Sequence, residues 1–546
     1  MTDSAPAMDA SSDPPRWTRW APAVAAIAGH FLALRNGFVL DDANLVTQNP
    51  YVRSFAGLGV LLRSGLFVAS HDPSTAADYY RPLSSALNWL SWQLFRDGRA
   101  GQHGLNVAMH VGVTLLLARA LRRWNVSAPI AAIAAAVFAV HPATAEIVAY
   151  VGGRQEMLGW IFVLTVLSAL PSARTAARCA LLGAAVTVLG AFSREAFLGS
   201  AAVLPIAAGL SPARARFDRR RAGATALGVA GGVLVVSAGR KLAGMRWSQP
   251  TSPHPPAEWI ETAVAFAARM AKDLLAPTDL VVDLALALPS LPVALLAAAL
   301  AIASVPLVRI ALRGPLEDRR GIALTGLLTM SAAVAVHTPV ALRMGATSDR
   351  YAYTFAVAAV MLAAPLAERA AAALAPHLAG SPLRRLVSAL PWLLAAALLP
   401  ATWARVAAYA DEAVLQRRMY EDRPDDPQSK MAEASRLLTL PDCVHALPLC
   451  LSYQEYYPRS SRAAPCIALC YLALGEKRLA VPSLQRYVAG GVGHEDLRVL
   501  LIRTLFDVGD LDAVERTLDE WRPAFAGAPD VIAARLELAR RRAATR

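Results

Sequence analysis

The sequence predicts an all-α protein in two parts, a polytopic membrane helix bundle followed by a soluble helical solenoid. Of the 546 residues, 55% are hydrophobic and 17% are charged, and the mean hydropathy is +0.39. Long apolar runs fill residues 20–405, whereas residues 410–546 have the composition of a soluble protein. Helices satisfy all their backbone hydrogen bonds inside lipid, so apolar runs of this length favour membrane-spanning helices.

The basic residues predict the membrane topology. The net charge of +13 can indicate nucleic-acid binding, but the Arg clusters lie between apolar runs, where the positive-inside rule places cytoplasmic loops. No nucleic-acid partner is therefore expected. Residues 1–15 are expected to be a disordered cytoplasmic N-terminus, residues 16–405 to form about eleven spans in the lipid bilayer, and residues 410–546 to lie outside the cytoplasm.

Polar motifs gather at the span ends that this topology places outside the cytoplasm. Two long external loops are expected, residues 38–102 and 240–291. Each contains an amphipathic stretch that predicts a helix lying on the membrane surface. In the first loop the apolar face is formed by Leu83, Leu87, Leu90 and Leu94, with Trp89 and Trp92. The cytoplasmic ends carry little beyond Arg, which indicates that the chemistry is done on the outer face.

The order of these motifs carries a resemblance to a known family. The motifs are "FVLDD…NP", "YRPLSSALN", "HPATAEIVAYVGGRQEML", "SREAF" and "SDRYAY", followed by a helical-repeat tail. This order resembles the transmembrane and tetratricopeptide-repeat O-mannosyltransferases and their bacterial relatives, which are glycosyltransferases of the C-type membrane fold. The resemblance implies a polyprenyl-phosphate-linked sugar as donor and a protein or peptide as acceptor.

Asp41 and Asp42 follow the first apolar run and are the expected catalytic residues. Sugar transfer needs a carboxylate to accept the proton of the attacking hydroxyl. In the family pattern the acid pair after the first span carries catalysis. Adjacent carboxylates repel each other and diverge on irregular backbone, so one acid is expected to face the acceptor, with a slight preference for Asp42. The alternative is a helix N-cap or a solvated loop acid.

Four arginines are candidates for binding the donor phosphate, because the guanidinium group presents a fixed fork of donors. They are Arg81, Arg350, Arg154 and Arg194, of which Arg81 and Arg350 are preferred. The alternative for each is snorkelling to the lipid headgroups. We expect three acids to support the site as partners of these arginines: Glu146, Glu156 and Glu195. Glu146 and Glu156 are equally compatible with purely structural ion pairs.

Histidines near the outer span ends raise the question of a metal. His103, His110 and His141 lie near acids, and such groups bind divalent cations in other proteins. None has the spacing of a metal motif, so hydrogen-bonded structural histidines are expected, and a divalent cation stays open. The step from His141 to Pro142 predicts a helix end.

The tail has a 34-residue period. Gly475 and Gly509 are 34 apart, as are Ala446 and Ala480, which is the tetratricopeptide spacing. About three helix pairs fit in residues 410–546. In the resembled family such a tail is thought to hold protein or peptide; a purely structural solenoid is the alternative.

Four of the five cysteines fall in the tail. On two antiparallel helices joined near Pro458, Cys450 meets Cys466 and Cys443 meets Cys470. In an oxidising periplasm these would form two disulfides. Reduced, buried cysteines are the alternative.

The leading hypothesis is a glycosyltransferase of a bacterial inner membrane, with the tail in the periplasm. The bacterial source is expected because the Ala- and Arg-rich composition is typical of high-GC bacteria. Two rivals stay open: transfer to a lipid-linked glycan or lipid A, and a non-catalytic membrane scaffold with partner-binding repeats. A scaffold has no need of the Asp pair. The sugar itself is not indicated.

Overall fold

The computed structural model describes residues 14–69, 79–212, 217–245, 255–277, 284–285, 320–344, 346–379, 381–458, 460–489, 495–520 and 529–544. The expected disordered N-terminus and one expected span, which follows the loop at residues 240–291, fall almost wholly outside these residues. The chain divides into two compact units, a first that runs to Glu412 and a second made mainly of the tail from Ala413. Each unit is described by itself.

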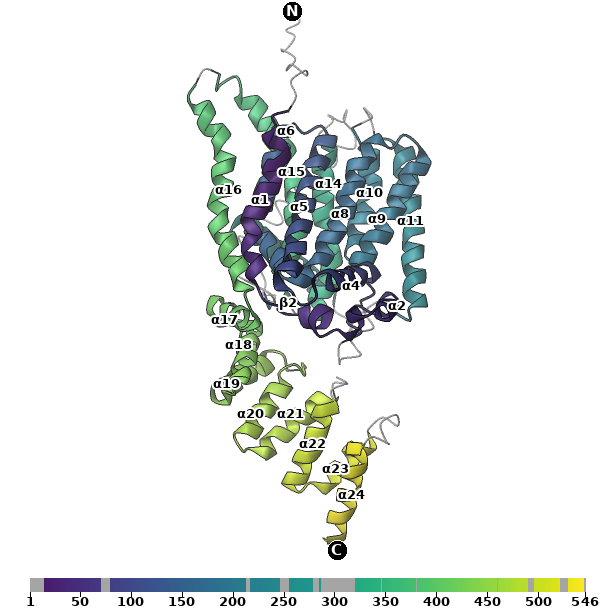
Figure 1. The fold of residues 1–546 in the computed structure, drawn as a ribbon, viewed down its shortest axis with the longest axis vertical. Helices are drawn as coiled ribbons and strands as arrows, with labels where there is room; N and C mark the ends of the chain where they lie inside the picture. Colours follow the sequence, from purple (N-terminus) through teal and green to yellow (C-terminus); the bar gives the residue numbers. More distant parts are fainter. Residues whose placement is uncertain are drawn as a thin grey trace, which may run out of the picture. The chain divides into compact units, whose positions relative to one another are not determined.

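The first unit is a helix bundle (Figure 1). Its α-helices are α1 (Trp17–His30), α2 (Phe55–Arg63), α4 (Pro82–Phe95), α5 (Arg99–Arg123), α6 (Ala128–Ala139), α7 (Ala145–Ala149), α8 (Arg154–Ala169), α9 (Ala176–Ser193), α10 (Phe197–Gly209), α11 (Arg219–Leu242), α12 (Pro256–Leu275), α14 (Arg320–Met344), α15 (Ala352–Leu374) and α16 (Leu383–Ala408). Short helical turns are η1 (Phe31–Arg35), η2 (Ala43–Thr47), η3 (Pro50–Arg53), η4 (Pro142–Thr144), η5 (Val151–Gly153), η6 (Leu170–Ser172) and η7 (Asp349–Tyr351). The described residues also include two-residue strands, β1 (Leu284–Ala285) and β2 (Ala346–Thr347).

The protein is a multi-pass membrane protein, and the predicted helical fold class is confirmed. Among the described residues, seven helices are long and apolar enough to cross a membrane, or eight if the bent pair α6–α7 is one span. Two further expected spans are shorter helices, α1 with 14 residues and the apolar α10 with 13. One more expected span lies outside the described residues, which accounts for the difference from eleven.

The bend between α6 and α7 is 62° and occurs at His141 and Pro142, where the sequence predicts a helix end. Pro142 has no backbone N–H, so α6 cannot continue through it. The His141 side chain caps the next turn, because its Nδ1 accepts the N–H of Ala143 at 3.1 Å. The residues that follow the bend, including Glu146 and Tyr150, therefore leave the axis of α6.

Helices α9 and α11 pack at very short range. A Cβ atom on Gly228 of α11 would lie 1.9 Å from the carbonyl oxygen of Ala180 in α9. Only glycine allows that approach, and small residues at helix interfaces are typical of membrane bundles, where van der Waals packing drives association. In Figure 1 the two helices lie side by side next to α8 and α10.

Helix α4 turns its polar face to the bundle. Ser84 and Ser91 are fully buried, and the Ser84 hydroxyl donates to the carbonyl oxygen of Ser193 at the end of α9 at 2.7 Å. Leu90 and Leu94 are 46% and 63% exposed. Outward leucines are the surface expected of a helix resting on lipid. The interfacial position itself remains a prediction.

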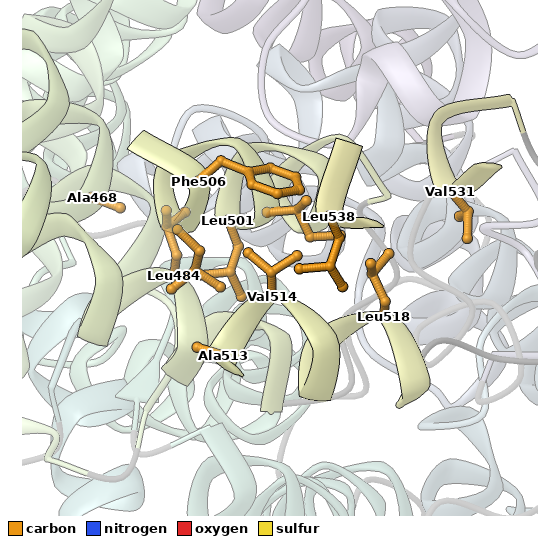
Figure 2. Packing of buried hydrophobic residues seen from close by; sticks show 11 residues of the cluster. Ala468, Leu484, Leu501, Phe506, Ala513, Val514, Leu518, Val531 and Leu538 are labelled. Atoms are coloured by element: carbon orange, nitrogen blue, oxygen red, sulfur yellow. The ribbon is translucent and has the colours of Figure 1, made fainter. Parts of the chain in front are cut away.

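The second unit consists of helices in antiparallel succession. They are α17 (Glu412–Asp422), α18 (Pro427–Thr439), α19 (Cys443–Tyr456), α20 (Ala464–Ala473), α21 (Lys477–Ala489), α22 (Glu495–Val508), α23 (Leu511–Asp519) and α24 (Pro529–Ala544). Buried aliphatic side chains from successive helices form its core. Figure 2 shows Leu484, Leu501, Val514 and Leu538 meeting in the C-terminal half of this core.

The 34-residue period is visible in the backbone at the helix ends. Gly475 and Gly509 adopt φ values of +82° and +79°, the left-handed conformation that favours glycine at a helix end. In each case the next N–H bonds back five residues, from Glu476 to Tyr471 at 2.8 Å and from Asp510 to Leu505 at 3.0 Å. The same type of turn therefore joins α20 to α21 and α22 to α23.

One of the two expected disulfides is present. Cys450 and Cys466 join α19 to α20, with their Cα atoms 6.3 Å apart. Cys443 and Cys470 are free thiols and are buried, so the expectation of a second disulfide is wrong in this structure. Burial, followed by a hydrogen bond with Cys443, raises the pKa of the Cys470 thiol to about 12, which keeps it protonated and unreactive.

Candidate active site

Hydrogen bonds to the residues around the end of α16 fix the start of the segment that carries the acid pair. After α1 and η1 the chain runs extended, and the Asn36 side chain donates to the carbonyl oxygen of Val406 at 2.9 Å. The N–H of Gly37 donates to Ala410 at 2.6 Å, and that of Leu40 to the Glu412 carboxylate at 2.7 Å. Leu40 has a φ of 54°, which is uncommon for a residue other than glycine. The end of α16 and the residues that follow it, up to Glu412, therefore hold the backbone just before Asp41.

Asp42 is completely buried and holds two backbone segments together. Its carboxylate accepts the N–H of Gly152 at 2.9 Å, of Val39 at 3.1 Å and of Val151 at 3.4 Å. Burial raises the pKa of Asp42 to about 7, against the opposing effect of these N–H donors. With no exposed surface, Asp42 cannot face an acceptor, which argues against the slight preference for this acid.

Asp41 is partly exposed and lies beside Tyr150. The phenol of Tyr150 donates a hydrogen bond of 3.0 Å to the Asp41 carboxylate. The guanidinium carbon of Arg350 lies 5.9 Å from the centre of the Tyr150 ring. A carboxylate and a cation from distant parts of the chain are thus brought to one tyrosine.

Arg350 lies on the turn η7, which a buried network holds in place. Its Nε donates to Glu146 at 3.1 Å, and its side chain is 23% exposed whereas that of Glu146 is 1% exposed. The preceding residue, Asp349, is buried and bonds to Arg269 of α12 at 3.0 Å and to Arg405 of α16. Two helices therefore position the backbone that presents Arg350.

Arg194 and Glu156 form a second pair of opposite charge. The Arg194 side chain is 13% exposed, and it contacts the buried Glu156 carboxylate. Thr354 also donates to Glu156, and Trp160 donates to Thr354 at 3.0 Å. The Arg194 guanidinium lies 5.4 Å from the ring centre of Tyr351, the residue after Arg350, so this pair adjoins the first.

Arg81 forms the third pair, at the start of α4. Its Nε donates to Glu195 at 2.7 Å and its Nη1 to Gln155 at 2.6 Å, and the side chain is 13% exposed. Arg240 of α11 approaches the other Glu195 oxygen at 3.4 Å. Because Gln155 and Glu195 adjoin Glu156 and Arg194 in the chain, the three partly exposed arginines form one cluster.

Arg154 differs from the other three arginines, because it is completely buried. Its nitrogens donate to Ser91 at 2.6 Å and to Asn106 and Gln102 at 3.1 Å. These acceptors come from α4 and α5, so Arg154 ties those helices to α8. With no exposed surface it presents no face to a phosphate, which argues against the expected role in donor binding.

The histidines make hydrogen bonds to protein atoms. His110 bonds to the Tyr353 hydroxyl at 2.9 Å and to the carbonyl oxygen of Ala139 at 3.1 Å. His141 bonds to the carbonyl oxygen of Leu274 at 3.0 Å, and His103 to that of Gly37 at 2.9 Å. Within the described part of the chain, no three His, Cys, Asp or Glu side chains are grouped to hold a metal ion.

Sequence reasoning missed Tyr150, Gln155 and Thr354 as members of this cluster. Tyr150 and Gln155 lie inside the quoted stretch "EIVAYVGGRQE", and Thr354 directly follows "SDRYAY". Their position within the motifs, or directly after one, was the signal that could have identified them. What could not be read was that the Tyr150 hydroxyl reaches Asp41, because nothing local in the sequence relates the two segments.

Comparison with known proteins confirms the resemblance to the O-mannosyltransferases. The chain is 32% identical over 145 residues to a protein O-mannosyl-transferase of Caenorhabditis elegans, which is 26% of this chain and 21% of that protein. It is 26% identical over 165 residues to Protein O-mannosyl-transferase TMTC4 of Homo sapiens, covering 28% and 22% of the two chains. It is 29% identical over 128 residues to Protein O-mannosyl-transferase TMTC3 of Mus musculus, covering 23% and 14%. The matches thus span 14% to 22% of the relatives' length. No family model and no solved structure matches.

Proposed function

We propose that this protein is a membrane glycosyltransferase that moves a sugar from a polyprenyl-phosphate donor to a hydroxyl group of a protein or peptide. The observation that carries the proposal is the convergence of Asp41 and Arg350 on Tyr150, beside two further arginine–glutamate pairs. The names of the matched relatives, all protein O-mannosyl-transferases, support the class of reaction and of acceptor.

Asp41 is the proposed general base. The acceptor oxygen attacks the anomeric carbon of the donor sugar, the bond from that carbon to the phosphate oxygen breaks, and the hydroxyl proton passes to the Asp41 carboxylate. Asp41 has exposed surface for this contact, whereas Asp42 has none. Asp42 is a positioning residue, because it ties the Asp41 segment to the backbone that presents Tyr150.

Arg350 is the proposed partner of the donor phosphate, with Arg81 and Arg194 beside it. The leaving polyprenyl phosphate gains negative charge as the sugar departs, and a fixed cation stabilises that charge without having to reorganise. The glutamate partners hold each guanidinium in place. A buried glutamate such as Glu146 would be costly without its cation, so the pair is maintained before the donor arrives.

The place of the reaction follows from the donor. A polyprenyl chain stays in the bilayer, so its phosphate reaches only the membrane surface. We propose a bacterial inner membrane, with the reaction on the extracytoplasmic face and the tail binding the acceptor in the periplasm. The repeating helix pairs supply an extended surface of the kind that holds peptides.

The test is transfer by the purified full-length protein. Polyprenyl-phosphate sugars are supplied one at a time, with a peptide that contains Ser and Thr and a matched peptide with Ala in their place. The proposal expects sugar on the first peptide only, together with loss of donor. Asp41→Asn is expected to lower the rate by about a hundred- to ten-thousand-fold while donor binding persists.

Three results would contradict the proposal. Transfer by Asp41→Asn at the wild-type rate would remove the assigned base. Sugar that moves to a lipid-linked glycan or to lipid A, and never to peptide, would keep the donor chemistry but replace the acceptor. Absence of donor consumption with every sugar tested would favour the scaffold alternative.

A further inference from the structure

A basic surface lies where α1 begins and α5 ends. A hollow of about 610 Å³ is lined by Arg19, Arg119, Arg122 and Arg123, with Leu115 and Ala118. A second, of about 240 Å³, shares Arg119 and Arg123 with the first and adds Arg178 and the hydroxyl residues Thr165, Ser168 and Ser172. A third, of about 380 Å³, shares Ser172 and Arg178 with the second and adds Arg174 and Thr175. We call these three adjoining hollows the arginine groove.

Of the residues that the structure describes, no acidic side chain lines the arginine groove. Among the described residues, Arg19, Arg119 and Arg122 form no salt bridge, and Arg123 bonds only to the carbonyl oxygen of Ser168 and the hydroxyl of Ser172. At the candidate active site, by contrast, each partly exposed arginine is paired with a glutamate. The groove therefore concentrates positive charge that no carboxylate of the described residues neutralises.

The positive-inside rule accounts for arginines at this kind of span end, but it does not require them to line a hollow. Arg219 and Arg220 at the start of α11 are also exposed, and they line none of the three hollows. Grouped guanidinium groups around a concave surface are the arrangement that binds phosphate oxygens.

We propose that the arginine groove binds the phosphate headgroup of an anionic phospholipid. Leu115 and Ala118 line the first hollow, and Leu116 and Ala169 line the second, so apolar surface adjoins the charge. A lipid presents a phosphate and hydrocarbon together, which a free phosphate ion does not. Basic hollows between membrane helices are a recurring setting for such headgroups.

The experiment uses the purified full-length protein in a nonionic detergent and counts bound lipid by native mass spectrometry. Phosphatidylglycerol is compared with phosphatidylcholine of the same acyl chains and with glycerol phosphate, which has no acyl chain. The variant is Arg119→Gln with Arg122→Gln. Its matched control, Arg219→Gln with Arg220→Gln, removes the same charge from an exposed span end outside the groove.

Wild-type protein is expected to retain phosphatidylglycerol in preference to phosphatidylcholine. Affinity for phosphatidylglycerol should fall by about 25-fold in the groove variant, from about fivefold for each of the two charges removed, and stay within about twofold in the control. Equal retention of the two lipids by wild-type protein overturns the proposal whether or not the variant folds. Equal losses in both variants, or displacement of the lipid by glycerol phosphate at the same concentration, also overturn it.

Discussion

Replacement of Asp42 by Asn is expected to destabilise the membrane unit, and not primarily to slow chemistry. The side chain keeps its size, and one oxygen can still accept the N–H of Gly152, which lies 2.9 Å from the Asp42 carboxylate in the wild type. The other oxygen, which faces the N–H groups of Val39 and Val151, becomes an amide nitrogen that cannot accept. Asp42→Asn therefore leaves two buried N–H donors without their acceptor.

The size of the effect follows from those two donors. A buried donor that loses its partner costs about 1–3 kcal/mol, so the loss in the free energy of unfolding is about 2–6 kcal/mol where Asp42 is protonated. Asp41→Asn is the matched control, because its side-chain oxygen still accepts from the Tyr150 hydroxyl and the residue is partly exposed. That variant should keep stability and lose turnover.

The difference between wild type and Asp42→Asn is expected to depend on pH. Burial raises the pKa of Asp42 in the folded protein to about 7, above the ordinary value of 3.8. The folded state then holds a proton that the unfolded state releases, so stability is greatest below the unfolded pKa and is lost as pH rises through the folded pKa. Between about pH 5 and pH 8, the free energy of unfolding of the wild type should fall by about 3 kcal/mol relative to that of the variant.

The assay is equilibrium unfolding in mixed micelles, followed by tryptophan fluorescence. Ten of the 11 tryptophans precede residue 413, so the signal reports the membrane unit. If Asp42→Asn unfolds at the wild-type midpoint at both pH values, the buried-carboxylate account fails. If it also abolishes transfer with stability intact, Asp42 and not Asp41 is the base.

Arg350→Ala should weaken donor binding and lower turnover together, while Arg350→Lys, which keeps the charge, restores part of both; unchanged donor affinity in the Ala variant would remove Arg350 from the phosphate site. The disulfide between Cys450 and Cys466 closes a loop with a sequence separation of 16, worth about 3 kcal/mol to the tail. Reduction should therefore speed proteolysis of the tail in the full-length protein by up to about a hundredfold, and equal rates with and without reductant would contradict this. Gly475→Ala places a side chain at a φ of +82° and should cost about 1 kcal/mol, measured as a lower unfolding midpoint of the tail; no change would show that the turn relaxes.

Several features of this protein could be predicted from its sequence because they are local. Apolar run length indicates spanning helices, and the 34-residue spacing of Gly475 and Gly509 indicates repeated helix pairs. Pro142 ends α6 because proline lacks an N–H, and that property belongs to the residue alone. Two cysteines spaced across a short connection were expected to meet, and Cys450 and Cys466 do.

Only the tertiary structure distinguishes the two members of the acid pair. In the sequence Asp41 and Asp42 are equivalent neighbours, and only the packing of η5 against them buries one and leaves the other partly exposed. The same holds for the arginines, because Arg154 is enclosed by α4 and α5 whereas Arg350 reaches the surface on η7. Burial depends on segments that are remote in the chain, so a motif can name the chemical groups while the fold determines which of them a substrate can touch.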